Sequence, residues 1–272
     1  MAKKKHYKLI AEIGWNFLGN ISLAKKMILS AKKSGADYVK FQIWNPKNLK
    51  PGKWDLDGRR QIYNKAFLDQ TKFKILYDYS KKIRIDCFAS VFSENDLAVY
   101  SKITKKIIKI PSHESYNLPL IKKSIDIFKT VIISCGCMKE TELKKLIKTV
   151  KNKNNVILMH CVSSYPLSEE NCNFEKFNFL KKKFRQVGYS GHLKGITDAM
   201  YAISQGSVLT EKHFTIDRGL EGRDNKFAIL PDEMRMLSNY SKTLENFKKN
   251  KGLGLQRCEM DIYKNYRGRW QK

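Results

Sequence analysis

The stretch QVGYSGHLKGITDAMYAISQGSVLTEKH, residues 186–213, contains one complete unit of the pattern that decides the fold. Two short apolar runs, Gln186–Ser190 and Val208–His213, have the length and composition of buried strands. Between them, Ile196–Gln205 has the spacing of an amphipathic helix. This order predicts two parallel strands joined by a crossover helix.

The same alternation continues along the chain. The candidate strands are Lys8–Ile13, Tyr38–Ile43, Ile85–Ala89, Ile107–Ile110, Val131–Ser134, Val156–His160, Gln186–Ser190 and Val208–His213. The candidate helices are Leu23–Ser34, Leu68–Lys82, Glu94–Ile103, Leu118–Phe128, Thr141–Lys151, Phe174–Lys183, Ile196–Gln205 and Pro231–Lys249. Eight such units in 272 residues predict an α/β fold of the (β/α)8 TIM-barrel type rather than an open sheet. We expect the barrel to span residues 1–250 and a short basic tail to span residues 251–272.

Composition limits the partners. The net charge of +27 comes mostly from lysines spread along every helix, which reflects either a codon bias or an anionic partner. The absence of any nucleic-acid-binding signature argues against DNA or RNA, and no apolar stretch is long enough to span a membrane. The six cysteines lack disulfide or zinc spacing, and the N-terminus does not read as a signal peptide. We therefore expect a cytoplasmic protein with reduced thiols.

Polar residues collect where the candidate strands end. They are Glu12, Asn16, Lys40, Gln42, Ser90, Lys109, Ser112, Glu114, Ser134, His160, Ser163, Tyr165, Ser190, His192, Glu211 and His213. Any one of them could be a structural group, but barrels keep their active sites at this end of the strands. Two long connections, Trp44–Phe67 and Thr215–Leu230, also follow strands and lie at the same end. Together these features predict a polar pocket with cations for phosphate and carboxylate groups.

His192 and His213 end neighbouring strands. Imidazole is a common metal ligand, and two imidazoles with water would leave an open site for Mn or Mg. The alternative for each histidine is a structural hydrogen bond, and for His160 the two interpretations remain equally open.

Seven segments follow one another along the chain: AEIGWNFLGN, GADYVKFQ, IIKIPSHESYNLPLI, VIISCGCM, LMHCVSSYP, VGYSGH and LTEKHFTIDRGLEGRD. In this order they resemble the motifs of the sialic acid synthase family, over about Leu9 to Lys249. The family includes synthases of N-acetylneuraminic, legionaminic and pseudaminic acids. The resemblance implies a homodimeric barrel that condenses phosphoenolpyruvate with an open-chain N-acetylhexosamine and releases phosphate.

The resemblance also implies roles for individual residues. Phosphoenolpyruvate would be bound by Lys40, Ser90, Lys109, Ser112, Ser134 and Ser190, with Ser90 standing where the family usually has Thr. His192 and His213 match two metal ligands, and Glu12 matches a catalytic carboxylate. Glu114, Tyr165 and Asp224 match groups near the sugar. Gln42, Ser163 and Glu211 complete the substrate-binding set that we predict.

Several positions depart from the family. Its SDH motif reads Ser190–Gly191–His192 here, so that an acid is lost, and Phe17 stands where it has His. The resemblance does not extend to the family's C-terminal antifreeze-like domain. Instead, the tail of a second subunit could cover the pocket mouth, and its candidate residues are Arg267, Arg269 and Trp270. A disordered tail is the alternative. These departures keep two other functions open: a related keto-acid aldolase or lyase, and a catalytically impaired barrel that binds sugar phosphates or partners.

Overall fold

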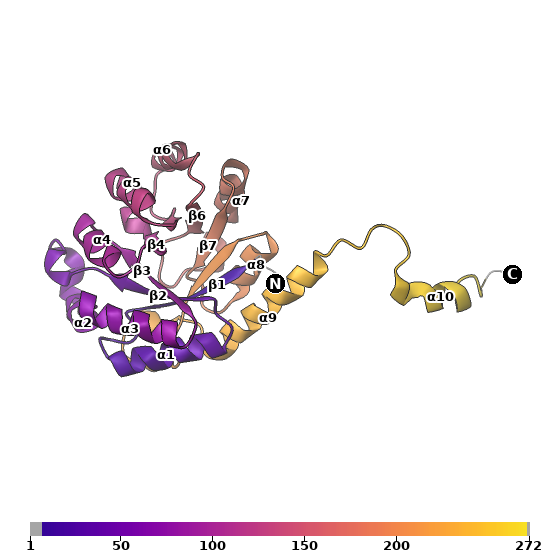
Figure 1. The fold of residues 1–272 in the computed structure, drawn as a ribbon, viewed down its shortest axis with the longest axis horizontal. Helices are drawn as coiled ribbons and strands as arrows, with labels where there is room; N and C mark the ends of the chain where they lie inside the picture. The colour runs from indigo at the N-terminus through magenta and orange to yellow at the C-terminus, as the bar shows by residue number, and fades with distance from the viewer. Residues whose placement is uncertain (1–6, 271–272) are drawn as a thin grey trace.

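A computed structural model describes residues 7–270, which form a closed barrel of eight parallel strands in chain order (Figure 1). The strands are β1 Lys8–Gly14, β2 Tyr38–Ile43, β3 Asp86–Val91, β4 Ile107–Ile110, β5 Thr130–Ser134, β6 Val156–Cys161, β7 Val187–Gly191 and β8 Leu209–His213. The predicted (β/α)8 barrel is confirmed, and strand boundaries agree to within two residues. The expectation about a signal peptide depended partly on the N-terminal segment. Residues 1–6 of this segment lie outside the residues that the structure describes.

The helices alternate with the strands. They are α1 Ile21–Lys33, α2 Arg59–Ala66, α3 Gln70–Lys82, α4 Glu94–Ser101, α5 Leu118–Ile127, α6 Glu140–Val150, α7 Phe174–Lys183, α8 Thr197–Ser204, α9 Pro231–Phe247 and α10 Met260–Asn265. Side chains cap several of their N-termini, as Asp69 does for α3 and Ser93 for α4. Such caps satisfy backbone N–H groups that have no partner within the helix. The cap at Asp69 explains why α3 begins two residues later than predicted.

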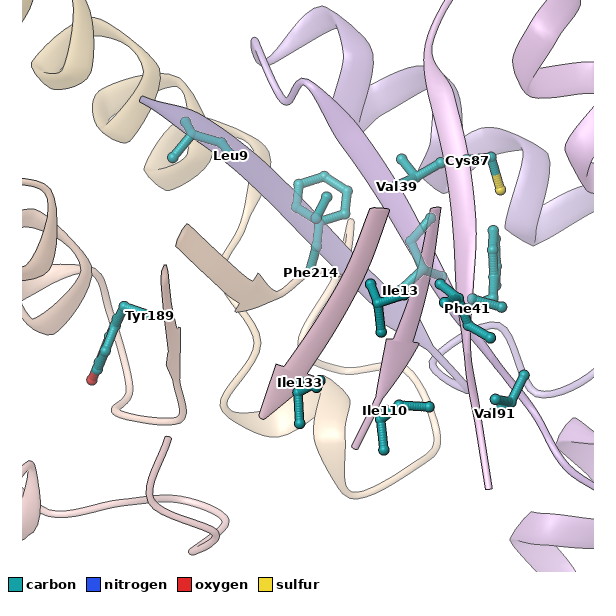
Figure 2. Packing of buried hydrophobic residues seen from close by; sticks show 14 of the residues in the cluster. Leu9, Ile13, Val39, Phe41, Cys87, Val91, Ile110, Ile133, Tyr189 and Phe214 are labelled. Carbon is teal, nitrogen blue, oxygen red and sulfur yellow. The ribbon is translucent and has the colours of Figure 1, made fainter. Parts of the chain in front are cut away.

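Two apolar layers hold the barrel together. The larger one lies between the strands and the surrounding helices, and Figure 2 shows some of its members, such as Leu9, Val39 and Ile133. The smaller one fills the barrel interior. Its buried members are Ile10, Phe88, Ile132, Met159 and Leu209. Because side chains alternate between the two faces of a strand, the next inward positions along β1 and β8 are Glu12 and Glu211. The apolar interior therefore forms a floor below a polar layer.

The connection Trp44–Phe67 differs from the expected loop, because it contains the helix α2 and two 3-10 turns. Gly58, with φ of 84°, allows the backbone to turn directly into α2. Only Ala66 of α2 is buried, so its sequence carried no strong apolar stripe for prediction. The Lys65 ammonium contacts Glu221 at 2.5 Å, which joins this connection to the one that follows β8.

The tail extends away from the barrel and ends in α10 (Figure 1). Arg267 and Arg269 stack on tail residues Tyr263 and Tyr266, and Trp270 is 75% exposed. The tail therefore does not cover the mouth of its own barrel. Within residues 7–270, no helix has the length and apolarity needed to cross a membrane.

Candidate active site

A buried ion pair between β1 and β2 forms one half of the polar layer. The Lys40 ammonium lies 2.6 Å from Glu12 Oε2 and donates to the Ser90 hydroxyl at 3.0 Å. Gln42, two positions along the same face of β2, donates to Glu12 Oε1 at 2.8 Å. Glu12 faces Lys40 in the strand register, which brings the two charges together without a long reach. The sequence-predicted residues of the first three strands thus meet in one network.

Glu211 on β8 forms the other half. Its Oε1 atom accepts hydrogen bonds from the Lys109 ammonium at 2.6 Å and from the Ser190 hydroxyl at 3.1 Å, and it lies 3.8 Å from the Lys40 ammonium. Its second oxygen, Oε2, is buried without a hydrogen-bond partner among the described residues. Burying a carboxylate oxygen without a hydrogen-bond partner costs free energy. This atom is therefore well placed to bind a cation or to accept a hydrogen bond from a ligand hydroxyl.

The two carboxyl groups respond differently to burial. Burial raises the pKa of Glu12, even though the Lys40 ammonium opposes this. Burial also acts to raise the pKa of Glu211, but the ammonium groups of Lys109 and Lys40 outweigh it and lower that pKa to about 2. Burial lowers the pKa of Lys109. Glu211 therefore stays ionised, while Glu12 is the better proton acceptor.

The imidazoles of His192 and His213 lie side by side, with ring centroids 5.5 Å apart. His192 Nδ1 donates to the Val162 carbonyl at 2.8 Å, which leaves its Nε2 atom as a lone-pair donor. Burial lowers the pKa of His192 to about 4 and that of His213 to about 3, so both rings are neutral near pH 7. These features fit a divalent cation, although residues 7–270 offer no cluster of three or more acidic, Cys or His side chains for one.

Tyr165 and Asp224 lie against this histidine pair. The Tyr165 ring centroid is 4.2 Å from that of His192 and 6.1 Å from that of His213. Asp224 Oδ2 lies 3.4 Å from His213 Nδ1 and accepts a hydrogen bond from Trp15 Nε1 at 2.5 Å. The neighbouring Asn225 holds Asp224 in place, because its buried side-chain amide donates to the Asn16 carbonyl at 3.1 Å.

The remaining predicted residues lie around β4 to β6. Gly136 allows Ser112 and Ser163 to approach, since a Cβ at this position would meet each hydroxyl at 2.6 Å. Ser134 is buried at the end of β5. Glu114 does not join these residues. Its carboxylate accepts a hydrogen bond from the side-chain amide of Asn117 at 3.1 Å.

His160 points away from the barrel interior, toward α7. Its ring packs against Phe174 and Phe177 of α7, and its Nε2 atom donates to the Cys172 carbonyl at 2.9 Å. The structural interpretation of His160 is therefore the one that its surroundings support.

Sequence reasoning missed residues at two places in the site. Cys161 is buried beside Ser112, at 3.5 Å, and beside His192 Nδ1, at 3.9 Å. Its position two residues after the inward-facing Met159 could have indicated this. Trp15 and Trp44 directly follow β1 and β2, and residues immediately after barrel strands line the mouth.

The mouth of this (β/α)8 barrel holds two lysines, three carboxylates and two neutral imidazoles. Such a set of side chains is typical of barrel enzymes. Residues 27–252 match the NeuB family. The chain belongs to this family.

The chain is also similar to individual proteins. The chain is 33% identical to the N,N'-diacetyllegionaminic acid synthase of Campylobacter jejuni, over 94% of this chain and 81% of that protein. It is 32% identical to the N-acetylneuraminate-9-phosphate synthase of Drosophila melanogaster, over 88% of this chain and 68% of that protein. The crystal structure of the N-acetylneuraminic acid (sialic acid) synthetase of Leptospira borgpetersenii, in complex with citrate, superposes with a TM-score of 0.85 and 30% identity, covering 98% of this chain and 93% of that one.

Proposed function

We propose that this protein condenses phosphoenolpyruvate with an N-acetylated amino-sugar aldehyde to give a nonulosonic acid and phosphate. Membership of the NeuB family supports the reaction class. The single observation in the site that best supports it is the buried network of Lys40, Lys109 and Glu211, because two ammonium groups that share one carboxylate can also receive a doubly anionic ligand.

Phosphoenolpyruvate carries a phosphate and a carboxylate. Lys40 and Lys109 come from strands β2 and β4 and would hold opposite ends of this anion. The hydroxyl groups of four further residues would donate hydrogen bonds to its oxygens. These residues are Ser90, Ser112, Ser134 and Ser190. The high positive charge of the chain would also attract the substrate.

His192 and His213 would hold a divalent cation, Mn or Mg. Such a cation would supply Lewis-acid activation of the aldehyde oxygen when bound. Tyr165, Ser163 and Asp224 would position the sugar beside the two imidazoles. Glu114 would contact the sugar from the rim.

The enol carbon of phosphoenolpyruvate would attack the aldehyde carbon and form the new C–C bond, while the C=O π bond breaks and the aldehyde oxygen takes a proton from solvent to become a hydroxyl. The neighbouring carbon would then become cationic and accept a water molecule, whose proton passes to Glu12. Its raised pKa suits Glu12 for this step. Collapse of the adduct would break the bond to phosphate and leave a keto acid.

The exposed apolar side chains of the tail, such as Ile262 and Trp270, support a homodimer, because large exposed apolar patches commonly mark interfaces. Free thiols at all six cysteines support a cytoplasmic location.

The decisive experiment is phosphate release from phosphoenolpyruvate with a panel of N-acetylhexosamines and added Mn. The synthase proposal requires release that depends on a sugar. Cleavage or formation of a keto acid without phosphoenolpyruvate would instead show an aldolase or lyase. Sugar binding without any turnover would show an impaired barrel.

A further inference from the structure

Lys212 lies on β8 between two residues of the candidate active site, Glu211 and His213, but its own side chain points out of the barrel toward α8. This direction follows from the alternation of side chains along a strand. The Lys212 side chain is 2% exposed, and its ammonium group donates to both oxygens of Asp198 at 3.0 Å. It also donates to the Leu193 carbonyl at 2.7 Å. The proposed reaction does not use this buried charge.

The contact with Leu193 joins the two strands that carry the imidazoles. Leu193 directly follows His192 in the chain. Lys212 directly precedes His213, and it pairs with Gly191 in the register of β7 and β8. One ammonium group therefore fixes the backbone beyond the end of β7 relative to β8, at a point one residue away from each histidine.

His192 is held on its other side by the connection that follows β6. Its carbonyl accepts a hydrogen bond from the Leu167 N–H at 3.0 Å, and its Nδ1 atom donates to the Val162 carbonyl at 2.8 Å. These contacts set the position of His192 relative to β6, whereas Lys212 sets its position relative to β8. The separation of the two imidazoles, 5.5 Å between ring centroids, thus depends on Lys212.

Asp198 holds the Lys212 ammonium in this place. Its Oδ1 atom accepts a hydrogen bond from the Ala199 N–H at 2.8 Å, and its Oδ2 atom accepts one from the Tyr189 hydroxyl at 3.0 Å. Apolar side chains of similar size commonly replace a buried ion pair without loss of stability. The directional contacts of this pair therefore explain its presence better than a gain in stability does.

We propose that Lys212 and Asp198 are positioning residues for a divalent cation. They set the separation at which His192 and His213 bind one ion, and they touch neither the ion nor a substrate. The inference rests on the proposed function, in which the two imidazoles hold that cation.

The experiment measures Mn binding to the full chain by competition with a chelating dye. The test variant is Lys212→Met/Asp198→Asn, which removes both charges together and leaves neither buried without its partner. Asparagine keeps an oxygen for the Tyr189 hydroxyl, while methionine has no donor for the Leu193 carbonyl. We expect Mn affinity to fall about tenfold or more, the scale on which loss of a residue that orients a metal ligand acts. At saturating Mn, kcat should recover and KM for phosphoenolpyruvate should be unchanged.

The matched control is Tyr100→Phe. It also removes a buried side-chain donor to a backbone carbonyl, that of Ile107 at 2.7 Å, but at the opposite end of the barrel. This variant should melt at a lower temperature and bind Mn as the natural chain does, which separates a loss of stability from a loss of positioning. Thermal melts establish that each variant is folded. Asp198→Asn alone, which should weaken Mn binding in the same direction, serves if the double variant is not.

Mn affinity equal to that of the natural chain in a folded test variant would overturn the inference. An equal loss of affinity in Tyr100→Phe, or a raised KM for phosphoenolpyruvate at saturating Mn, would overturn it as well. All three results leave the synthase function standing if the natural chain releases phosphate with a sugar. If no sugar gives phosphate release, the synthase function fails, and the dye competition still decides the inference. If the natural chain binds no Mn, the inference fails, and phosphate release decides the function separately.

Discussion

The carboxylate of Asp198 occupies the space that a side chain at Gly191 would need. A Cβ at position 191 would lie 2.2 Å from Asp198 Oδ2. Both oxygens of Asp198 accept from the buried Lys212 ammonium at 3.0 Å, and Oδ2 also accepts from the Tyr189 hydroxyl at 3.0 Å. A carboxylate from the first turn of α8 thus stands where a side chain at position 191 would lie.

This arrangement predicts that positions 191 and 198 are coupled. Gly191→Ala should destabilise the protein by about 1–3 kcal/mol, because Asp198 is fixed and cannot move aside. Asp198→Ala should cost about 3–5 kcal/mol, since it leaves the Lys212 ammonium buried without its carboxylate. The double variant Gly191→Asp/Asp198→Ala should be more stable than Asp198→Ala alone. Urea unfolding measures all three, with Gly254→Ala as the control because nothing lies near that position. A double variant that is no more stable than Asp198→Ala would contradict the coupling.

Lys109→Ala should raise KM for phosphoenolpyruvate about ten- to a hundredfold, equivalent to roughly 1.5–3 kcal/mol for a hydrogen bond to a charged group. The substitution also leaves Glu211 with Lys40 at 3.8 Å as its remaining cation, so like-charge repulsion adds to the loss. Steady-state kinetics with varied phosphoenolpyruvate measure the effect. Lys144→Ala, at an exposed ion pair on α6, should change nothing. Unchanged kinetics in Lys109→Ala would rule out its assignment.

A chelator should abolish activity, and Mn or Mg should restore it. His213→Ala should abolish turnover and leave the thermal melt nearly unchanged. A protonated imidazole cannot bind a cation, but burial holds the pKa of His192 near 4 and that of His213 near 3. Cation affinity should therefore change little between about pH 7.5 and about pH 5.5, where an ordinary histidine would already be protonated. Competition with a chelating dye at both pH values measures this. Full activity in excess chelator would end the metal proposal.

Stability should fall in mild acid because of His160. Burial lowers its pKa from 6.5 to about 4, so its ring is neutral in the folded state, whereas the unfolded chain gains a proton below pH 6.5. The contribution is complete above pH 6.5 and is lost as the pH falls toward 4, by up to roughly 3 kcal/mol. His160→Gln keeps a donor for the Cys172 carbonyl and should make this dependence shallower, while His192 and His213, whose pKa values burial also lowers, maintain the rest of it. Equal slopes of unfolding free energy against pH in the two proteins would refute the assignment.

Removal of residues 251–272 should weaken the proposed homodimer and leave the melting temperature of the barrel unchanged, because the tail lies away from its own barrel and exposes apolar side chains such as Trp270. Sedimentation equilibrium measures the dimer. A shorter deletion, of Asp261–Lys272, should impair sugar use more than phosphoenolpyruvate binding if a partner's tail covers the mouth. Normal turnover of the truncated protein would show that it does not.

The sequence by itself determined the eight strands, the helices of the barrel other than α2, and the side chains that face the barrel interior. These features depend on local periodicity: alternation places Lys40 and Gln42 on one face of β2, and chain order places His192 and His213 on neighbouring strands. Parallel strands in a closed barrel end at one mouth, so residues at strand ends could be assigned to one site.

Only the tertiary structure decided how those side chains pair. Glu211 binds Lys109, which is 102 residues away in the chain, because barrel closure and the stagger of the strands set which inward positions share a level. The replacement of a side chain at Gly191 by Asp198 and the meeting of Tyr63 with Trp15 depend on how α8 and α2 pack on the strands. A local pattern records the face on which a residue lies, whereas the identity of its neighbour depends on the packing of segments distant in sequence.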